Sequence, residues 1–298
     1  MEFAVVALLG LLLALWFAGE PLLIAWRRSR LRRRPFPAAW RAILRQRVPY
    51  LSGLPADLQL QVKRHVQVLL AEKRFVGCGG LELTDDMRVT IAAQASLLLL
   101  NRRTDYFARL REVLVYPGQY VVQHVQGDGS GVLHARREVR AGESWTQGQV
   151  VLSWDDVLAG AAAPDDGRNV VIHEFAHQLD QEKGHANGAP WLGARARQAR
   201  WTRVLGAAYA ALQARLQQQP AAATGAGLDT VSGAETGAAT DPTTDAPPLI
   251  DPYAATSPAE FFAVVSEVFF ERPQRLAAEQ PALYREFSGY YRVDPLSW

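Results

Sequence analysis

Apolar side chains repeat along most of this chain with helical spacing, and the pattern predicts a mainly helical protein. Helical spacing marks residues 58–75, 88–100, 169–181, 191–216, 258–271 and 283–291. Short apolar runs bounded by turn residues predict strands at 113–116, 120–122 and 149–154. Because helices and strands occur in separate blocks, the order favours an α+β fold with a small β-sheet over a doubly wound parallel sheet.

The N-terminal residues 1–26 are predicted to form one membrane-spanning helix. Residues 3–26 carry a single charge, on Glu20, and provide roughly the 20 apolar residues that a bilayer-spanning helix needs. Only Glu2 precedes the run, whereas six arginines follow it within residues 27–36, and basic flanks stay on the cytoplasmic side. We therefore expect a single-pass protein of the inner (cytoplasmic) membrane, a basic juxtamembrane segment at 27–36, and a C-terminal part that faces the cytoplasm.

Residues 37–298 are predicted to form one globular domain with a low-complexity insertion at 217–248. The insertion is dominated by Ala, Gly, Thr, Asp and Pro, so it cannot bury enough apolar surface to order itself. A net charge of only +2 gives no field that would attract nucleic acid, and we expect no nucleic-acid partner. Cys78 is the single cysteine, which excludes an intramolecular disulfide and a multi-cysteine metal site. We interpret it as a core residue and not as a nucleophile.

The most informative segment for function is a His-Glu-x-x-His motif inside the apolar helix at 169–181. His173 and His177 lie one helical turn apart on the same face, so their imidazoles can hold one zinc ion, Zn²⁺. Glu174 is then placed to take a proton from the water that zinc activates. The apolar neighbours indicate a buried helix, where polar side chains without partners are costly. Asp180 is interpreted either as a hydrogen-bond acceptor for a liganding imidazole or as a turn acid.

A catalytic zinc site needs a third protein ligand, and the sequence offers three candidates. His185 is near the motif, but its spacing differs from that of zincins with a third histidine. Glu260 and Glu267 lie two turns apart on one face of the helix at 258–271. Glu260 also fits a capping box that begins at Ser257. Spacing alone does not separate a cap from a ligand.

The two motif segments together resemble the Mlc titration factor A (MtfA) family of peptidases. The resemblance runs from about Arg41 to the C-terminal end and is carried by His173-Glu174-Phe175-Ala176-His177-Gln178-Leu179-Asp180, Tyr253 and Pro258-Ala259-Glu260-Phe261-Phe262-Ala263. It implies a zincin-like domain similar to the catalytic domain of anthrax lethal factor, with Glu260 as the third ligand and Glu267 in reserve. It also implies that Tyr253 hydrogen-bonds the tetrahedral intermediate, where the alternative is a buried tyrosine that anchors the chain. The family's association with the glucose repressor Mlc implies a transcriptional repressor as a partner.

These observations predict a zinc-dependent peptidase with one Zn²⁺ ion. His173, His177 and Glu260 are expected to bind the metal, while Glu174 and Tyr253 act on a peptide or protein substrate. The substrate backbone is expected to add to an exposed strand near residues 150–154. The alternative is a membrane-tethered protein that sequesters a repressor and holds a structural zinc. Four protein ligands close a structural zinc site, whereas a catalytic site keeps one position for water.

Overall fold

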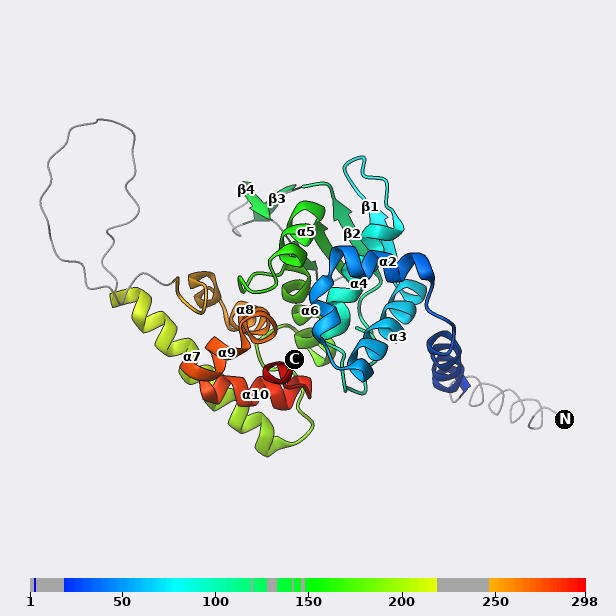
Figure 1. Ribbon diagram of the computed structural model, residues 1–298. Helices are drawn as coiled ribbons and strands as arrows, with labels where there is room; N and C mark the ends of the chain where they lie inside the picture. The colour runs from blue at the N-terminus through cyan, green and yellow to red at the C-terminus, as the bar shows by residue number, and fades with distance from the viewer. Residues whose placement is uncertain are drawn as a thin grey trace, which may run out of the picture. The chain divides into compact units, whose positions relative to one another are not determined.

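The computed structural model describes residues 3, 19–118, 120–127, 133–140, 142–145, 148–218 and 247–298 (Figure 1). These residues belong to two compact units. Unit 1 runs to residue 163 and includes 169–175 and Trp298, whereas unit 2 comprises 164–168 and 176–297. The boundary falls inside one continuous helix, α6 (Val170–Asp180), which carries the His-Glu-x-x-His motif.

Several helices of unit 1 pack around α4 (Asp85–Leu97), whose C-terminal two thirds are buried. The helices of this unit include α2 (Ala38–Arg47), the 3-10 helix η1 (Pro49–Gly53), α3 (Ala56–Glu72), α4 and α5 (Trp154–Ala162). The helix α4 begins at Thr84, whose side chain accepts a hydrogen bond from the Met87 backbone N–H. From Val89 to Leu97 every residue of α4 is buried, which explains why this helix shows little amphipathic pattern.

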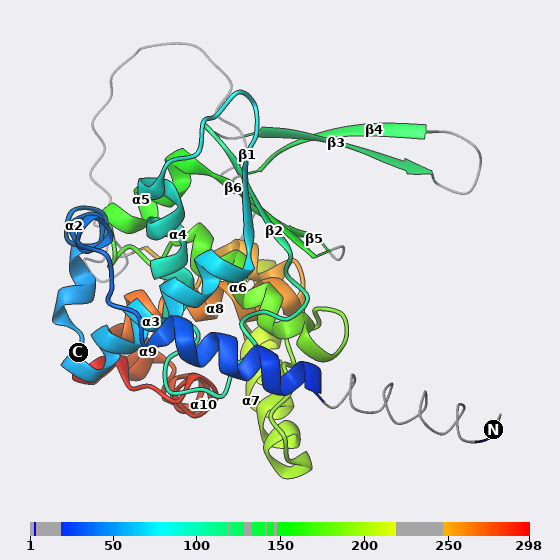
Figure 2. The same cartoon turned by 90° about the vertical axis from the view of Figure 1, so that its right-hand side faces the viewer.

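Unit 1 also contains a four-stranded sheet with the strand order β1-β2-β6-β5. Its strands are β1 (Arg74–Gly77), β2 (Glu112–Tyr116), β5 (Gly142–Trp145) and β6 (Gln149–Ser153). The strands β1, β2 and β6 are parallel, and β5 is antiparallel to β6. The inner strands bury Val113, Val115, Val150 and Leu152 completely. A separate antiparallel ribbon of β3 (Tyr120–Gly127) and β4 (Leu133–Arg140) extends away from this sheet (Figure 2).

Unit 2 is helical and has an aromatic core. Its further elements are η2 (Gln181–Lys183), α7 (Arg195–Gln218), η3 (Pro252–Ala255), α8 (Pro258–Glu271), α9 (Pro273–Glu279), α10 (Pro281–Tyr291) and η4 (Pro295–Ser297). Trp201 of α7 stacks on Phe287 of α10 with a centroid separation of 5.2 Å, and Phe262 of α8 lies 5.7 Å from the same Phe287 ring. All three side chains are almost fully buried, so α8 is held at the centre of its unit.

The structure confirms a mainly helical protein with a small sheet but corrects two expectations about its strands. The helix predicted at 58–75 ends at Glu72, and Arg74–Gly77 forms β1 because it pairs in parallel with β2. Three strands of the sheet are parallel, and α4 lies between β1 and β2 in the chain. The expectation that helices and strands occur in separate blocks is therefore wrong. The strand near residues 150–154, expected to receive substrate, is β6, which already has a neighbour on each side.

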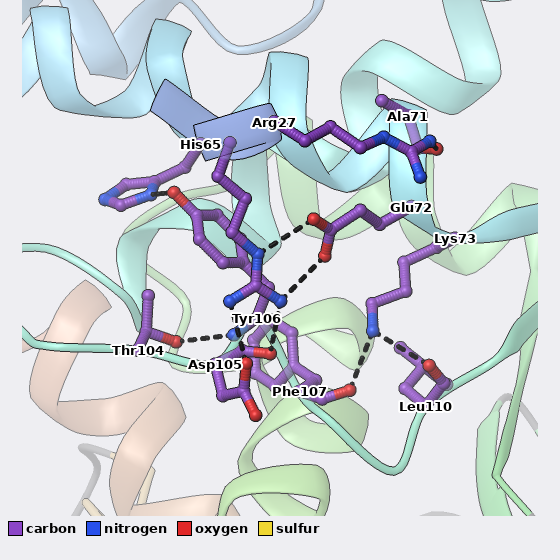
Figure 3. A network of polar contacts seen from close by, with 11 residues as sticks. Arg27, His65, Ala71, Glu72, Lys73, Thr104, Asp105, Tyr106, Phe107 and Leu110 are labelled. Atoms are coloured by element: carbon purple, nitrogen blue, oxygen red, sulfur yellow. Dashed lines mark hydrogen bonds and ion pairs between the residues drawn. The ribbon is translucent and has the colours of Figure 1, made fainter. Parts of the chain in front are cut away.

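The predicted membrane-spanning helix, and with it the inner-membrane location and cytoplasmic orientation, is wrong. Within the ranges that the structure describes, no helix is long and apolar enough to cross a bilayer. Of the proposed anchor, residues 1, 2 and 4–18 lie outside the described residues. The described part, 19–32, is one helix that continues through the arginines read as a flank. Arg28 in this helix hydrogen-bonds the carboxylates of Glu72 and Asp105, which are labelled in Figure 3, so at least this arginine is part of the folded unit.

The low-complexity insertion predicted at 217–248 falls mostly on residues 219–246, which lie outside the described residues. The last two residues before this range, 217 and 218, close the helix α7. The chain is described again from Pro247 and reaches the buried pair Leu249 and Ile250. The domain bounds predicted for residues 37–298 stay a prediction.

Candidate metal centre

The helix α6 is fixed at its start by Asn169. The Asn169 carboxamide oxygen accepts a hydrogen bond from the Ile172 backbone N–H at 3.0 Å, as expected of an N-cap residue. The same carboxamide donates to the Gln94 side chain of α4 at 2.8 Å. This buried cap ties the beginning of α6 to the central helix of unit 1, and it sets where the motif begins.

Polar side chains of α6 are enclosed by apolar ones. Val171, Ile172, Phe175, Ala176 and Leu179 are each at most 2% exposed. Glu174 and His177 are nevertheless 4% and 7% exposed, although burying polar groups costs free energy unless they gain partners. The burial inferred from the sequence is therefore present, and the buried polar residues of this helix are Glu174 and His177 of the motif together with Gln178 and Asp180.

Three side chains of the motif segments converge. His173, His177 and Glu260 each offer one nitrogen or oxygen atom, and these atoms all lie within 4.8 Å of one another. The His177 Nε2 and Glu260 Oε2 atoms are 3.4 Å apart. This arrangement of two imidazoles and one carboxylate is a donor set that could hold a metal ion.

Glu260 takes part in a helix cap and also faces the imidazole. Ser257 precedes the first residue of α8, and its hydroxyl oxygen accepts a hydrogen bond from the Glu260 backbone N–H at 3.1 Å. The cap uses the backbone of Glu260, while its carboxylate oxygen Oε2 lies beside His177. The two alternatives that the spacing left open thus involve different atoms of the same residue.

The other candidates for a third ligand lie outside this group. Glu267 is buried two turns further along α8, and His185 is exposed in the turn that follows η2. Among the described residues, the group of mutually close metal-binding side chains contains neither of them. The geometry favours Glu260 over both.

Exposure and hydrogen bonds bear on the alternative roles considered for Tyr253 and Asp180. Tyr253 lies in η3 and is 52% exposed, so it is not the buried anchor considered as an alternative. Asp180 accepts hydrogen bonds from the backbone N–H groups of Asn187 and Gly188, both at 2.7 Å, which is the expected behaviour of a turn acid. Burial raises the pKa of Asp180, while these hydrogen bonds and the neighbouring His177 oppose that shift.

A family model agrees with the motif and extends over nearly the whole chain. The model of the glucose-regulated metallo-peptidase M90 family matches residues 23–292. The chain belongs to this family. The M90 family assignment points to a metallopeptidase, in agreement with the side chains gathered at α6 and α8.

Individual M90 relatives cover most of the chain as well. The uncharacterized protein slr2042 of Synechocystis is 36% identical over 290 residues, which are 97% of this chain and 95% of that protein. Mlc titration factor A of Cronobacter sakazakii is 34% identical, with 87% of this chain and 88% of that protein covered. Mlc titration factor A of Klebsiella pneumoniae is 35% identical over 84% of both chains. The resemblance inferred from the two motif segments is confirmed.

The residues that support this group differ in how visible they are in the sequence. Asn169 directly precedes an apolar run and carries a visible N-cap signal. Gly188 and Trp201 carry no such signal, because their contacts are with residues far along the chain. Gly188 lies against Pro258 at the start of α8, and the Trp201 indole donates a hydrogen bond to the Gly188 carbonyl oxygen at 3.0 Å.

Proposed function

We propose that the chain is a zinc peptidase in which His173, His177 and Glu260 bind the metal. The observation that carries the proposal is the approach of these three side chains to one point. All three ligands are nitrogen or oxygen donors, with two imidazoles, a set that suits zinc better than the all-oxygen preference of calcium and magnesium. The M90 family assignment supports hydrolysis of peptide bonds as the reaction.

The distance between two ligands supports a metal between them. The 3.4 Å between His177 Nε2 and Glu260 Oε2 is longer than the usual range of about 2.7–3.2 Å for an N–H···O hydrogen bond. Two ligands at about 2.1 Å from a tetrahedral zinc ion are roughly 3.4 Å apart. The pair thus has the separation of two ligands of one ion, and the residues present fit the group that the family implies.

Glu174 is the proposed general base. Bound zinc would supply Lewis acidity, which polarises the substrate carbonyl and lowers the pKa of an attacking water. Glu174 follows the first ligand directly and is 4% exposed, so its carboxylate is held in a largely water-free environment beside the ligands. It takes the proton of the attacking water and returns it to the leaving amine. The Tyr253 hydroxyl, on a half-exposed side chain, donates a hydrogen bond to the developing oxyanion.

Replacing Glu174 with Gln tests this assignment. The Glu174→Gln variant should bind zinc as the wild type does and lose turnover of a peptide library by about 10²-fold to 10⁴-fold, because a positioned base contributes that much. Zinc content and cleavage rate are measured on the same preparations. Glu182→Gln, which removes a carboxylate from η2 just beyond α6, is the matched control and should keep wild-type turnover. Wild-type turnover in Glu174→Gln would refute the mechanism.

A second candidate function follows from the names of the relatives. Several of them are Mlc titration factor A proteins, and a chain of this family could capture a transcriptional repressor of the Mlc kind. Direct titration of the purified chain with such a repressor tests this candidate. Binding that persists in Glu174→Gln would separate capture from cleavage, whereas the absence of binding would remove the second candidate.

A further inference from the structure

A turn after α6 is attached to the last residue of that helix. Asp180 lies three residues after His177 and is 5% exposed. Its Oδ2 atom accepts hydrogen bonds from the Asn187 and Gly188 backbone N–H groups, both at 2.7 Å. Because one carboxylate oxygen takes two backbone donors, the turn is held at a fixed distance from the helix end that carries His177.

Gly188 brings this turn against the first residue of α8. It has a φ of +73°, and a Cβ at this position would lie 2.2 Å from the Pro258 carbonyl oxygen and 2.8 Å from its carbonyl carbon. Both the backbone conformation and the close approach therefore require glycine. Pro258 is two residues before Glu260, so the turn contacts α8 at the start of the helix that carries the third ligand.

Trp201 makes a further contact with the turn. Its indole N–H donates to the Gly188 carbonyl oxygen at 3.0 Å, and the side chain is 1% exposed. The Trp201 ring also lies 5.9 Å from the ring of Phe262, two residues after Glu260. The backbone of Gly188 is thus held by hydrogen bonds at its N–H and its carbonyl oxygen. The absence of a side chain lets it lie against Pro258.

We infer that Asp180 and Gly188 are positioning residues that set the place of Glu260 relative to His177. The inference rests on the proposed function, because it concerns these two residues as metal ligands. The connection runs from His177 through Asp180, the turn and Pro258 to Glu260, and every link is a hydrogen bond or a backbone contact within unit 2. Metal ligands must be held to within about 0.5 Å, so a shift of this turn should alter metal binding directly.

Gly188→Ala is the variant that tests the contact. Real Cβ atoms essentially never lie within 3.0 Å of another heavy atom, so the new methyl group must push the turn and Pro258 apart by at least about 0.8 Å. We expect the affinity for Zn²⁺, measured by chelator competition, to fall about 10-fold to 100-fold, as for other changes in residues that support metal ligands. The visible spectrum of the Co²⁺-loaded protein should change as well, because it reports ligand geometry.

Gly193→Ala is the matched control for backbone strain. Gly193 has a φ of +83°, but its nearest neighbour for an added Cβ is the flexible Arg197 guanidinium at 3.4 Å. This variant should lose stability through its backbone conformation and keep wild-type Zn²⁺ affinity and Co²⁺ spectrum. A folded Gly188→Ala protein with wild-type affinity and spectrum would overturn the inference.

Two substitutions of Asp180 decide the matter if Gly188→Ala does not fold. Asp180→Ala leaves the Asn187 and Gly188 N–H groups without their acceptor, so Zn²⁺ affinity should fall, whereas Asp180→Asn keeps an acceptor oxygen and should retain most of it. Equal losses in both would indicate a charge effect on His177 and overturn the positioning role. Metal binding by the wild type without peptide cleavage would refute only the peptidase proposal, and a wild type that binds no metal would refute both.

Discussion

Two partly buried polar clusters of this chain differ in the kinds of atoms that they bring together. In unit 1, Arg28 forms a bidentate pair with Glu72, with hydrogen bonds of 2.8 and 2.9 Å, and a further one of 2.7 Å to Asp105 (Figure 3). The Lys73 ammonium donates to two backbone carbonyl oxygens, both at 2.8 Å. Each cation in this cluster faces acceptors.

The group at α6 and α8 consists of metal-binding atoms instead of cations and their acceptors. His173, His177 and Glu260 bring ring nitrogens and a carboxylate oxygen together, and these are the atoms by which side chains bind metal ions. A cluster in which cations face acceptors offers no obvious place for a metal ion, whereas a cluster of imidazole nitrogens and a carboxylate oxygen is a donor set that could hold one. Burial of polar groups alone therefore does not mark a metal site. The kind of atoms that lie close together does.

The largest expected difference between the clusters is in metal affinity. Glu260→Gln removes the only carboxylate among the three proposed ligands and should weaken Zn²⁺ binding on the order of 10³-fold, or about 4 kcal/mol. Glu267→Gln, two turns further along the same buried helix, should leave the affinity unchanged. Competition with a chromophoric chelator measures both. Loss of affinity in Glu267→Gln but not in Glu260→Gln would move the third ligand to Glu267.

Local sequence signals were sufficient to locate the helices of the centre. The helix α8 begins and ends where the pattern placed it, because Ser257 and Pro258 form a recognisable helix start. The helix α6 matches its predicted range to within one residue at each end, since its apolar run is long and follows Asn169. The ligand role of Glu260 required the family resemblance, because the same residue also satisfies a cap.

Features that depend on distant partners were missed. The strand β1 has only four residues and continues a helical pattern, and its identity depends on pairing with β2, almost forty positions later. The contact between Gly188 and Pro258 joins positions seventy residues apart. The apolar N-terminal run and the arginines after it predict a membrane anchor by hydropathy. Hydropathy does not show that Arg28 pairs with Glu72, a residue 44 positions later. Each of these errors concerns an interaction that lies outside any local window.

Unit 1 should also respond to acid, through the buried His65 beside Tyr106. Burial lowers the pKa of this imidazole to about 4, and the charge of Arg32 adds to the effect. The unfolded chain, with a histidine pKa of about 6.5, binds more protons than the folded one between these values. The free energy of unfolding should therefore fall as the pH drops from about 6.5 to 4, by up to about 3 kcal/mol.

Substituting the imidazole isolates its share of this pH dependence. His65→Gln keeps a polar side chain near the Tyr106 hydroxyl, which lies 3.1 Å from the His65 Nδ1 atom, and removes the titrating group. Urea unfolding across this pH range, with a chelator present so that metal release does not contribute, should show a flatter profile for the variant. Identical profiles for the two proteins would show that His65 is not the group responsible.

The smallest expected effect is a loss of stability without a loss of metal. Glu72→Gln removes one charge-assisted hydrogen bond from the bidentate pair with Arg28, in which both side chains are 15% exposed. The free energy of unfolding should fall by about 1–2 kcal/mol. Asp105→Asn changes the other partner of Arg28, whose side chain is 69% exposed, and should cost less than about 0.5 kcal/mol because water screens that pair.

Measuring the Zn²⁺ affinity of these two variants tests whether the two clusters act independently. If the unit 1 cluster is complete by itself, both Glu72→Gln and Asp105→Asn should bind Zn²⁺ as the wild type does, even where the first unfolds at lower urea concentration. The unit 1 cluster would then contribute to stability alone, and the group at α6 and α8 would determine Zn²⁺ affinity. A decrease in Zn²⁺ affinity in Glu72→Gln as large as that in Glu260→Gln would show that the two clusters do not act independently.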